Sequence, residues 1–352
     1  MNLPAGVRNF SYARDMAIFR TKTHWAMLLL LFIILFTAPG YLPNYWLGVI
    51  NLIFITIIAA TGLNILTGYC GQLSIGHAGF IAAGAYTSAV LTNSLGLPFL
   101  VGLISAGLLS GLIGVLFGLP SLRVKGFYLA ISTIAAQFII IWVINHWSGV
   151  TGGFVGMSVP PAEIGGFQFI SQSSKYFLIL SLTIMVIFFA KNLVRTRVGR
   201  AFVAIRDNDL AAEVMGIDLF RYKLLAFFIG CFLAGIAGAL LAHCKYGFLN
   251  AEYFSLTESI LFVGMIIIGG LGTTVGPIFG VILIRLLDEM LRMEFVPMLE
   301  STFKALPAGW ASGLAPLIFG LVIILFLILE PRGLAHRWQL FKASYRLWPF
   351  SY

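Results

Sequence analysis

The stretch GRAFVAIRDNDLAAEVMGIDLFRYK, residues 199–223, carries four basic and four acidic residues in a chain where only 10% of residues are charged. Hydrophobic residues make up 60% of the 352 residues. A soluble domain usually carries about 25% charged residues, so these charges are too few to cover a soluble globule. Lipid is therefore expected to be the main solvent, and the side of the membrane on which 199–223 lies decides the topology.

Outside this stretch, apolar runs dominate the chain. A membrane-spanning helix needs about 20 mostly apolar residues. Ten such runs lie near residues 24–42, 46–68, 73–93, 98–119, 127–147, 175–192, 223–243, 255–271, 275–291 and 311–330. The sequence therefore predicts an all-α polytopic membrane protein with about ten transmembrane helices, forming a single domain over residues 1–352.

The distribution of lysine and arginine predicts which segments face the cytoplasm. With the N-terminus inside, the inner segments are 1–23, 69–72, 120–126, 193–222, 272–274 and 331–352. These segments and their helix-end flanks hold 17 of the 22 Lys and Arg residues, and the outer side holds five. This positive-inside pattern predicts an even number of spans and cytoplasmic tails at 1–23 and 331–352. It also explains the net charge of +9 without a nucleic-acid partner.

The sequence contains few signs of catalytic or metal chemistry. Cys70, Cys231 and Cys244 include no CxxC pair, so no disulfide and no zinc site are expected. There is no HExxH motif and no GxxxxGK[ST] phosphate-binding loop. A protease built on Ser74 and His77 would lack an orienting carboxylate. We therefore expect no metal and no cofactor on this chain, and no enzymatic activity of its own.

The polar segment 193–222 is the largest predicted cytoplasmic connection, and its centre has the pattern of a short helix. Asp207 or Asn208 can cap this helix, and Gly216 can end it. Its apolar face is formed by Leu210, Ala211, Val214 and Met215. A solvated loop with anchoring charges is one interpretation, and a docking element for a cytoplasmic partner is the other. The cap, the apolar face and the glycine stop favour docking.

Five ordered stretches resemble the permease subunits of branched-chain amino acid ABC importers. They are GLNILTGYCGQLSIGHAGFIAAGAYTSAVL (62–91), LRVKGFYLAIST (122–133), TGGFVGM (151–157), the stretch 199–242 and IIIGGLGTTVGPIFG (266–280). Together they span about residues 50–335. Within 199–242, residues 211–216 fit the AAxxxG core of the loop by which such permeases engage their ATPases.

The resemblance implies the ABC importer permease fold in a bacterial inner membrane. It implies two ATPase subunits that bind the ATP, a second homologous permease and a periplasmic binding protein. The second permease would make a heterodimer, although nothing in the sequence excludes a homodimer. By the same resemblance, the coupling residues are Arg206, Asp207, Ala211, Ala212, Glu213 and Gly216.

Two glycine-rich interruptions, residues 68–79 and 269–277, are candidates for the transport path. Irregular backbone within a membrane is tolerated only against protein or a water-filled cavity, and broken helices often mark transport sites. The candidate path residues are Asn64, Gly71, Gln72, Ser74, Gly76, His77, Thr133, Gln137, Gly269, Gly270 and Gly272. Close helix packing through small residues is the alternative for each glycine, and Gly235 and Gly238 fit packing alone.

Several charged or polar side chains near the predicted helix ends are given simpler roles. His77 is expected to be a neutral hydrogen-bonding residue that holds the 70–80 turn. Glu258 lies near the outer end of its span, and Arg285 with Asp288 is expected to be an ion pair at a helix end. Many family members have a carboxylate near the position of Gln137, and this chain has none there. This difference leaves the identity of the substrate undetermined and does not affect the expected fold.

Two other kinds of function compete with an ABC permease. A secondary transporter or channel for small polar solutes would usually need buried ionisable residues for ion coupling, and buried acids are nearly absent from the predicted spans. An ABC permease for urea or amides would share the whole pattern. The sequence leaves open the exact substrate, the helix boundaries and whether the polar intramembrane residues contact substrate or only pack.

Overall fold

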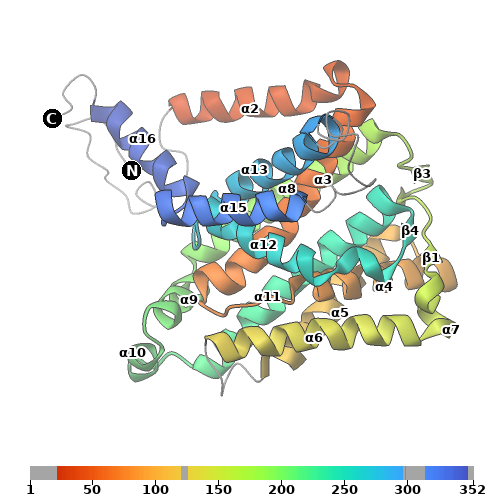
Figure 1. Cartoon of the computed structure of the whole chain (residues 1–352), viewed down its shortest axis with the longest axis horizontal. Helices are drawn as coiled ribbons and strands as arrows, with labels where there is room; N and C mark the ends of the chain where they lie inside the picture. The colour runs from red at the N-terminus through yellow and green to blue at the C-terminus, as the bar shows by residue number, and fades with distance from the viewer. Residues whose placement is uncertain (1–21, 120–125, 296–297, 299–313, 348–352) are drawn as a thin grey trace. The chain divides into compact units, whose positions relative to one another are not determined.

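The computed structural model describes residues 22–119, 126–295, 298 and 314–347 (Figure 1). It divides into two units, residues 1–47 and 48–352, which are described separately. The single domain over 1–352 therefore stays a prediction. The first unit contains the apolar helix α2 (Lys22–Tyr41), with Pro39 in its last turn, and the first residues of α3.

The second unit consists mainly of helices. They are α3 (Asn44–Leu63, beginning in the first unit), η1 (Asn64–Tyr69), α4 (His77–Ser94), α5 (Phe99–Gly118), α6 (Phe127–His146), α7 (Ser148–Thr151), η3 (Gly153–Val155), α8 (Gln172–Arg195), α9 (Arg197–Asp207), α10 (Asp209–Val214), α11 (Leu219–Leu240), η4 (Leu241–Tyr246), η5 (Ala251–Phe254), α12 (Leu256–Gly269), α13 (Gly276–Met290), η6 (Leu291–Phe295), α15 (Leu314–Leu329) and α16 (Leu334–Leu347). Within the described residues, each of the ten apolar runs overlaps a helix, although α4 begins only at His77.

Length and composition separate these helices into classes. Five stretches of the described chain are long and apolar enough to cross a membrane. They are Asn44–Tyr69, Phe99–Gly118, Phe127–His146, Gln172–Arg195 and Leu219–Tyr246. The bent pair Pro316–Leu329 and Leu334–Ser344 would make a sixth if it forms one span. The structure is therefore a helical membrane-type fold with five or six spans by these criteria.

The two glycine-rich interruptions do interrupt helices. The first span runs from α3 into the π-helical turn η1, and α4 begins only at His77. Gly71 has a φ of +71° between them, which a residue with a side chain rarely adopts. Likewise α12 ends at Gly269 and α13 begins at Gly276, with Pro277 in its first turn. Proline is favoured there because its missing N–H would be unpaired in any case.

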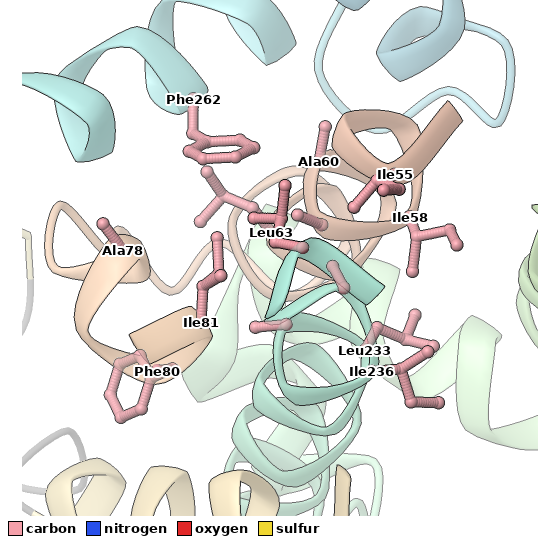
Figure 2. Close-up of a cluster of buried hydrophobic side chains, with 14 of the residues drawn as sticks. Ile55, Ile58, Ala60, Leu63, Ala78, Phe80, Ile81, Leu233, Ile236 and Phe262 are labelled. Atoms are coloured by element: carbon pink, nitrogen blue, oxygen red, sulfur yellow. The ribbon is translucent and has the colours of Figure 1, made fainter. Parts of the chain in front are cut away.

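Helix α11 lies at the centre of the core and packs mainly against α5 and α4, which also pack against each other. A Cβ placed on Gly235 of α11 would lie 2.3 Å from the carbonyl oxygen of Ala106 in α5, so only glycine permits this approach. A Cβ on Gly238 would lie 2.1 Å from the carbonyl oxygen of Ile81 in α4. Both glycines therefore serve packing, as expected. Figure 2 shows Leu233 and Ile236 of α11 in the same apolar cluster.

Two small sheets add to the expected all-α fold. Strand β1 (Met157–Ser158) pairs antiparallel with β4 (Phe248–Leu249), and β2 (Glu163–Ile164) pairs antiparallel with β3 (Phe167–Gln168). The β1–β4 pair joins the loop after α6 to the loop after η4. In Figure 1, β1, β3 and β4 lie at the opposite end of the long helices from α9 and α10.

Candidate functional site

The predicted coupling segment folds into two short helices, α9 and α10, joined at Asn208. The side chain of Asn208 accepts a hydrogen bond of 3.1 Å from the backbone N–H of Ala211, so Asn208 rather than Asp207 is the N-cap. Gly216 has a φ of +82° and donates its N–H to the carbonyl of Glu213, while Ile217 donates to Ala212. This pair of bonds is the glycine-terminated helix end known as the Schellman motif.

The apolar face of α10 points away from the rest of the chain. Leu210, Val214 and Met215 are 67%, 87% and 81% exposed. By contrast, Ala212 is 3% exposed, so it is the residue by which α10 packs against its own chain. Exposed apolar side chains gathered on one short helix indicate an interaction surface rather than a solvated loop.

An ion pair ties α10 to α11. The Lys223 Nζ atom lies 3.6 Å from Asp209 Oδ2, and their side chains are 4% and 19% exposed. Removing one member of a buried pair leaves an uncompensated charge, so this contact holds α10 in a defined position.

Arg206, at the end of α9, contacts the first glycine-rich interruption. Its Nη1 donates to the carbonyl oxygen of Gly68 at 3.1 Å. Its Nε and Nη2 donate to Asp207 Oδ1 at 2.9 and 2.8 Å, which fixes the plane of the guanidinium. A Cβ placed on Gly272 would lie 2.6 Å from Arg206 Nη1, so the same side chain also reaches the second interruption. A Cβ on Gly71 would lie 3.0 Å from Arg206 Cγ.

Asn64 of η1, just before the first interruption, joins this turn to the second interruption. Its Nδ2 donates to the carbonyl of Thr273 at 2.8 Å, and its Oδ1 accepts from the backbone N–H of Gly272 at 3.0 Å. The two segments are more than 200 residues apart in the sequence. A Cβ on Gly68 would lie 2.5 Å from the backbone nitrogen of Gly272, so the backbones themselves touch here. The first interruption, the second and the coupling segment therefore meet at one place.

Thr133 and Gln137 of α6 hold the far end of the first interruption. Thr133 Oγ1 accepts from the N–H of Ile75 at 3.0 Å, and a Cβ on Gly76 would lie 1.9 Å from the Thr133 carbonyl oxygen. Gln137 Oε1 accepts from the hydroxyl of Ser259 at 2.7 Å. That hydroxyl oxygen in turn accepts from the N–H of Ala78 at 2.8 Å.

Gly71 is exposed and Gly272 is half-buried, whereas the five remaining predicted path residues are buried: Gln72, Ser74, His77, Gly269 and Gly270. His77 Nε2 lies 3.0 Å from the carbonyl of Ala59, which agrees with a residue that holds the turn. Gln72 is 7% exposed and its Nε2 is 3.5 Å from the carbonyl of Cys70. In the described chain, Ser74 Oγ and His77 Nδ1 are buried without a hydrogen-bond partner.

In the second interruption, a Cβ on Gly269 would lie 2.0 Å from the Gly276 carbonyl oxygen, and Gly270 has a φ of +112°.

A separate polar cavity was not anticipated from the sequence. It is lined by five charged residues, Lys245, Glu258, Arg285, Asp288 and Glu289, and by none of the eleven predicted path residues. Arg285 forms an ion pair with Glu258 at 3.2 Å. The sequence suggested Asp288 as the partner of Arg285 and did not suggest Glu258. Arg285, Asp288 and Glu289 within one apolar run could have signalled this cavity, since charges inside spans tend to mark functional sites.

One protein family matches most of this sequence. The family is described as "branched-chain amino acid transport system / permease component", and the match covers residues 45–328. These residues include the interruptions, the coupling segment and the polar cavity.

Individual proteins are similar over comparable lengths. The high-affinity branched-chain amino acid transport system permease protein LivM of Salmonella typhimurium is 30% identical over 332 residues, which are 87% of this chain and 74% of that protein. The autoinducer 2 import system permease protein LsrC of Enterobacter sp. strain 638 is 28% identical over 320 residues, 87% of this chain and 85% of that protein. Among solved structures, PsaBC from Streptococcus pneumoniae in complex with Fab covers 86% of this chain and 97% of that chain, with 13% identity and a TM-score of 0.42.

Proposed function

The chain belongs to the family of branched-chain amino acid transport system permease components, and from this premise we propose that it carries branched-chain amino acids across the bacterial inner membrane as one subunit of an ATP-driven importer. In this proposal the chain spans the membrane ten times with both termini in the cytoplasm. The positive-inside distribution of Lys and Arg supports the orientation, and a helix over each of the ten apolar runs supports the count.

The observation that carries the proposal is the exposed apolar surface of α10, next to a contact with both helix interruptions. Leu210, Val214 and Met215 offer a docking surface to a cytoplasmic partner. The sequence holds no phosphate-binding loop, so an ATP-driven importer needs its nucleotide sites on other chains. An ATPase subunit seated on α10 supplies the force.

The contacts around Arg206 support a route for that force. An ATPase that displaces α9 and α10 moves Arg206 with them, and Arg206 acts on the carbonyl of Gly68. Asn64 then transmits the displacement from the first interruption to the second. Movement of the two interruptions changes which side of the membrane the path opens to.

The partners follow from this mechanism and from the family. Two ATPase subunits, a second homologous permease and a periplasmic binding protein would complete the importer, and membrane lipid surrounds the permeases. A heterodimer of permeases is the version we propose. The binding protein selects the solute, and this chain provides part of the path.

Uptake by reconstituted vesicles tests the proposal. The chain is placed in proteoliposomes with its permease partner and ATPases, and radiolabelled leucine is added with the binding protein outside. Leucine should accumulate only when ATP is enclosed and all subunits are present. Uptake by this chain alone, driven by a proton or sodium gradient, would instead show a secondary transporter.

A second candidate is an ABC permease for a solute other than an amino acid. The similarity to an autoinducer 2 import permease over 87% of this chain is the observation that favours it. A ligand screen on the partner binding protein separates the two candidates. The screen should return leucine, isoleucine or valine if the chain handles branched-chain amino acids.

A further inference from the structure

A cavity of about 260 Å³ lies between α3, α4, α12, α13 and the turn η4. Pockets for drug-sized ligands have roughly 300–1,000 Å³, so this cavity suits a smaller solute. Two cationic and three acidic side chains line it: Lys245, Arg285, Glu258, Asp288 and Glu289. Ionisable groups among membrane helices are costly and are usually functional. The cavity therefore requires an explanation beyond packing.

Arg285 is more deeply placed in this cavity than its partner Glu258, whose side chain is 31% exposed. Its side chain is 10% exposed, its Nη2 lies 3.2 Å from Glu258 Oε2, and its Nε donates to Thr56 Oγ1 at 3.3 Å. The guanidinium has a third nitrogen, Nη1, which takes part in neither contact. Because a guanidinium carries five N–H donors, Arg285 can bind a carboxylate while Glu258 and Thr56 hold it in place.

The cavity also contains a positive and a negative side chain outside the Arg285–Glu258 pair, namely Lys245 and Glu289. In the described part of the chain, neither Lys245 nor Glu289 forms an ion pair with another residue. One cation and one anion are thus available in the same cavity, besides the pair of Arg285 with Glu258. A neutral amide or urea would need no charged partner, whereas a zwitterion needs one of each sign.

One wall of the cavity is apolar. Ile55, Ile81, Phe254 and Phe262 line it, and each is 4% exposed or less. Figure 2 shows Ile55, Ile81 and Phe262 within the buried cluster. Moving aliphatic surface from water onto such a wall is favourable in proportion to its area. The wall therefore suits a branched hydrocarbon side chain.

We propose that this cavity binds a zwitterionic α-amino acid with an aliphatic side chain. Lys245 and Arg285 hold the carboxylate, Glu289 holds the ammonium group, and the wall formed by Ile55 and Phe262 holds the side chain. Glu258 positions Arg285. The assignment rests on the proposed function, because it locates within this chain the amino acid that the importer carries.

The cavity adjoins the first helix interruption, which links binding to the coupling segment. Ala78 lies at the end of the interruption and lines the cavity, and its N–H donates to Ser259 Oγ at 2.8 Å. The same interruption contains Gly68, whose carbonyl accepts from Arg206. A solute in the cavity therefore lies against a segment that the coupling segment holds at its other end.

Ligand competition on the assembled transporter in nanodiscs, without the binding protein, tests the charge requirement. The probe is radiolabelled leucine, and the competitors are leucinamide, which lacks the carboxylate, and 4-methylpentanoate, which lacks the ammonium group. Unlabelled leucine should displace the probe about tenfold or more better than either analogue, because each analogue loses a hydrogen-bonded charge. Equal displacement by leucine and leucinamide would overturn the proposal.

Variants locate the binding in this cavity. Lys245→Gln and Glu289→Gln should each weaken leucine binding, and lower ATP-driven uptake with saturating binding protein, by about tenfold or more. The matched controls are Lys175→Gln and Glu252→Gln, which change the same charges outside the cavity. Lys245→Arg and Glu289→Asp should restore part of the uptake. Co-purification of the ATPases with each variant verifies folding.

The outcomes separate this inference from the proposed function. If the wild-type transporter takes up leucine with ATP and both Gln variants match it, the cavity is not the site and the importer assignment stands. If the wild type takes up no amino acid, the importer assignment fails. The binding competition between leucine and leucinamide then still tests whether the cavity requires a carboxylate on its ligand.

Discussion

Among single residues, Arg206 makes the contact on which the coupling mechanism depends most. We predict that Arg206→Ala lowers ATP-driven uptake by about tenfold or more while ATP hydrolysis continues, because a hydrogen bond to a charged group contributes about 1.5–3 kcal/mol. Uptake and hydrolysis are measured on the same proteoliposomes. Arg200→Ala is the control, since Arg200 lies on the same helix but donates to the carbonyl of Arg195. Equal loss of uptake in both variants would contradict the mechanism.

Gly76 gives a second prediction at this scale, and it concerns stability. A Cβ at this position would lie 1.9 Å from the carbonyl oxygen of Thr133, which is backbone and cannot rotate away. Gly76→Ala should therefore destabilise the folded protein by about 1–3 kcal/mol or more, the usual cost of overpacking. The thermal midpoint of the purified protein in detergent measures this effect. Gly149→Ala should leave the midpoint unchanged, because a Cβ there meets nothing within 4 Å.

The sequence predicted those residue roles that depend on local chemistry. A cap at Asn208 and a stop at Gly216 could be expected, because both depend on neighbours within four residues. The contact of Arg206 with Gly68 joins residues 138 positions apart, and no local pattern encodes it. For the same reason, the sequence suggested that Asn64 and Gln137 are functional but could not give their partners.

At the scale of elements, α10 supplies the docking prediction. Met215→Glu should abolish co-purification of the ATPase subunits, because it places a charge in an apolar contact. The permease should keep its fold, since Met215 is 81% exposed. Val155→Glu is the control, because Val155 is 82% exposed on η3. Turn η3 lies in the sequence between α7 and β1, which in Figure 1 are at the opposite end of the long helices from α10. Retention of the ATPases by the Met215 variant would argue against α10 as their docking site.

Changing the small residues of α10 should have a different effect. Ala212 is 3% exposed, so Ala212→Arg should disturb the packing of α10 on its own chain as well as the docking. A Cβ on Gly216 would meet nothing within 4 Å, but the φ of +82° means that any side chain there strains the backbone. Substitutions at these two positions therefore test whether docking needs the correct conformation of α10. The Met215 variant tests whether docking needs its apolar surface.

The helices themselves were the most predictable elements, because apolar runs of about 20 residues have few alternatives in lipid. The interruptions were predicted from glycine and proline. The pairing of β1 with β4 was not predicted, because it joins two-residue strands some 90 residues apart in the sequence. The polar cavity was missed because its charges come from η4, α12 and α13, and each charge by itself resembles a helix-end residue.

For the molecule as a whole, the orientation in the membrane is the testable feature. Cys70, Cys231 and Cys244 are buried, so single introduced cysteines can be labelled selectively. A membrane-impermeant maleimide should label Met215→Cys only in inside-out vesicles and Val155→Cys only in right-side-out vesicles. Labelling of both from one side would contradict the proposed topology. The parent protein, which has only the native cysteines, controls for reaction at those positions.

The apolar composition indicated that the protein lies in a lipid membrane. The distribution of Lys and Arg suggested which segments face the cytoplasm. How many helices cross the membrane was harder to predict, because length and hydropathy identify five or six spans while ten helices cover the apolar runs. Helices such as α4 and α13 carry too many small or charged residues to resemble spans by composition alone. Their surroundings, rather than their own sequences, determine whether they cross.

The glycine-mediated contacts of α11 have a consequence for how the transporter moves. Backbones that touch at Gly235 and Gly238 leave no side-chain layer that could slide or rotate. Helices α4, α5 and α11 should therefore travel as one rigid body during the transport cycle. The bending that alternating access requires is left to hinges at Gly71 and Gly270, where the chain has already departed from helix.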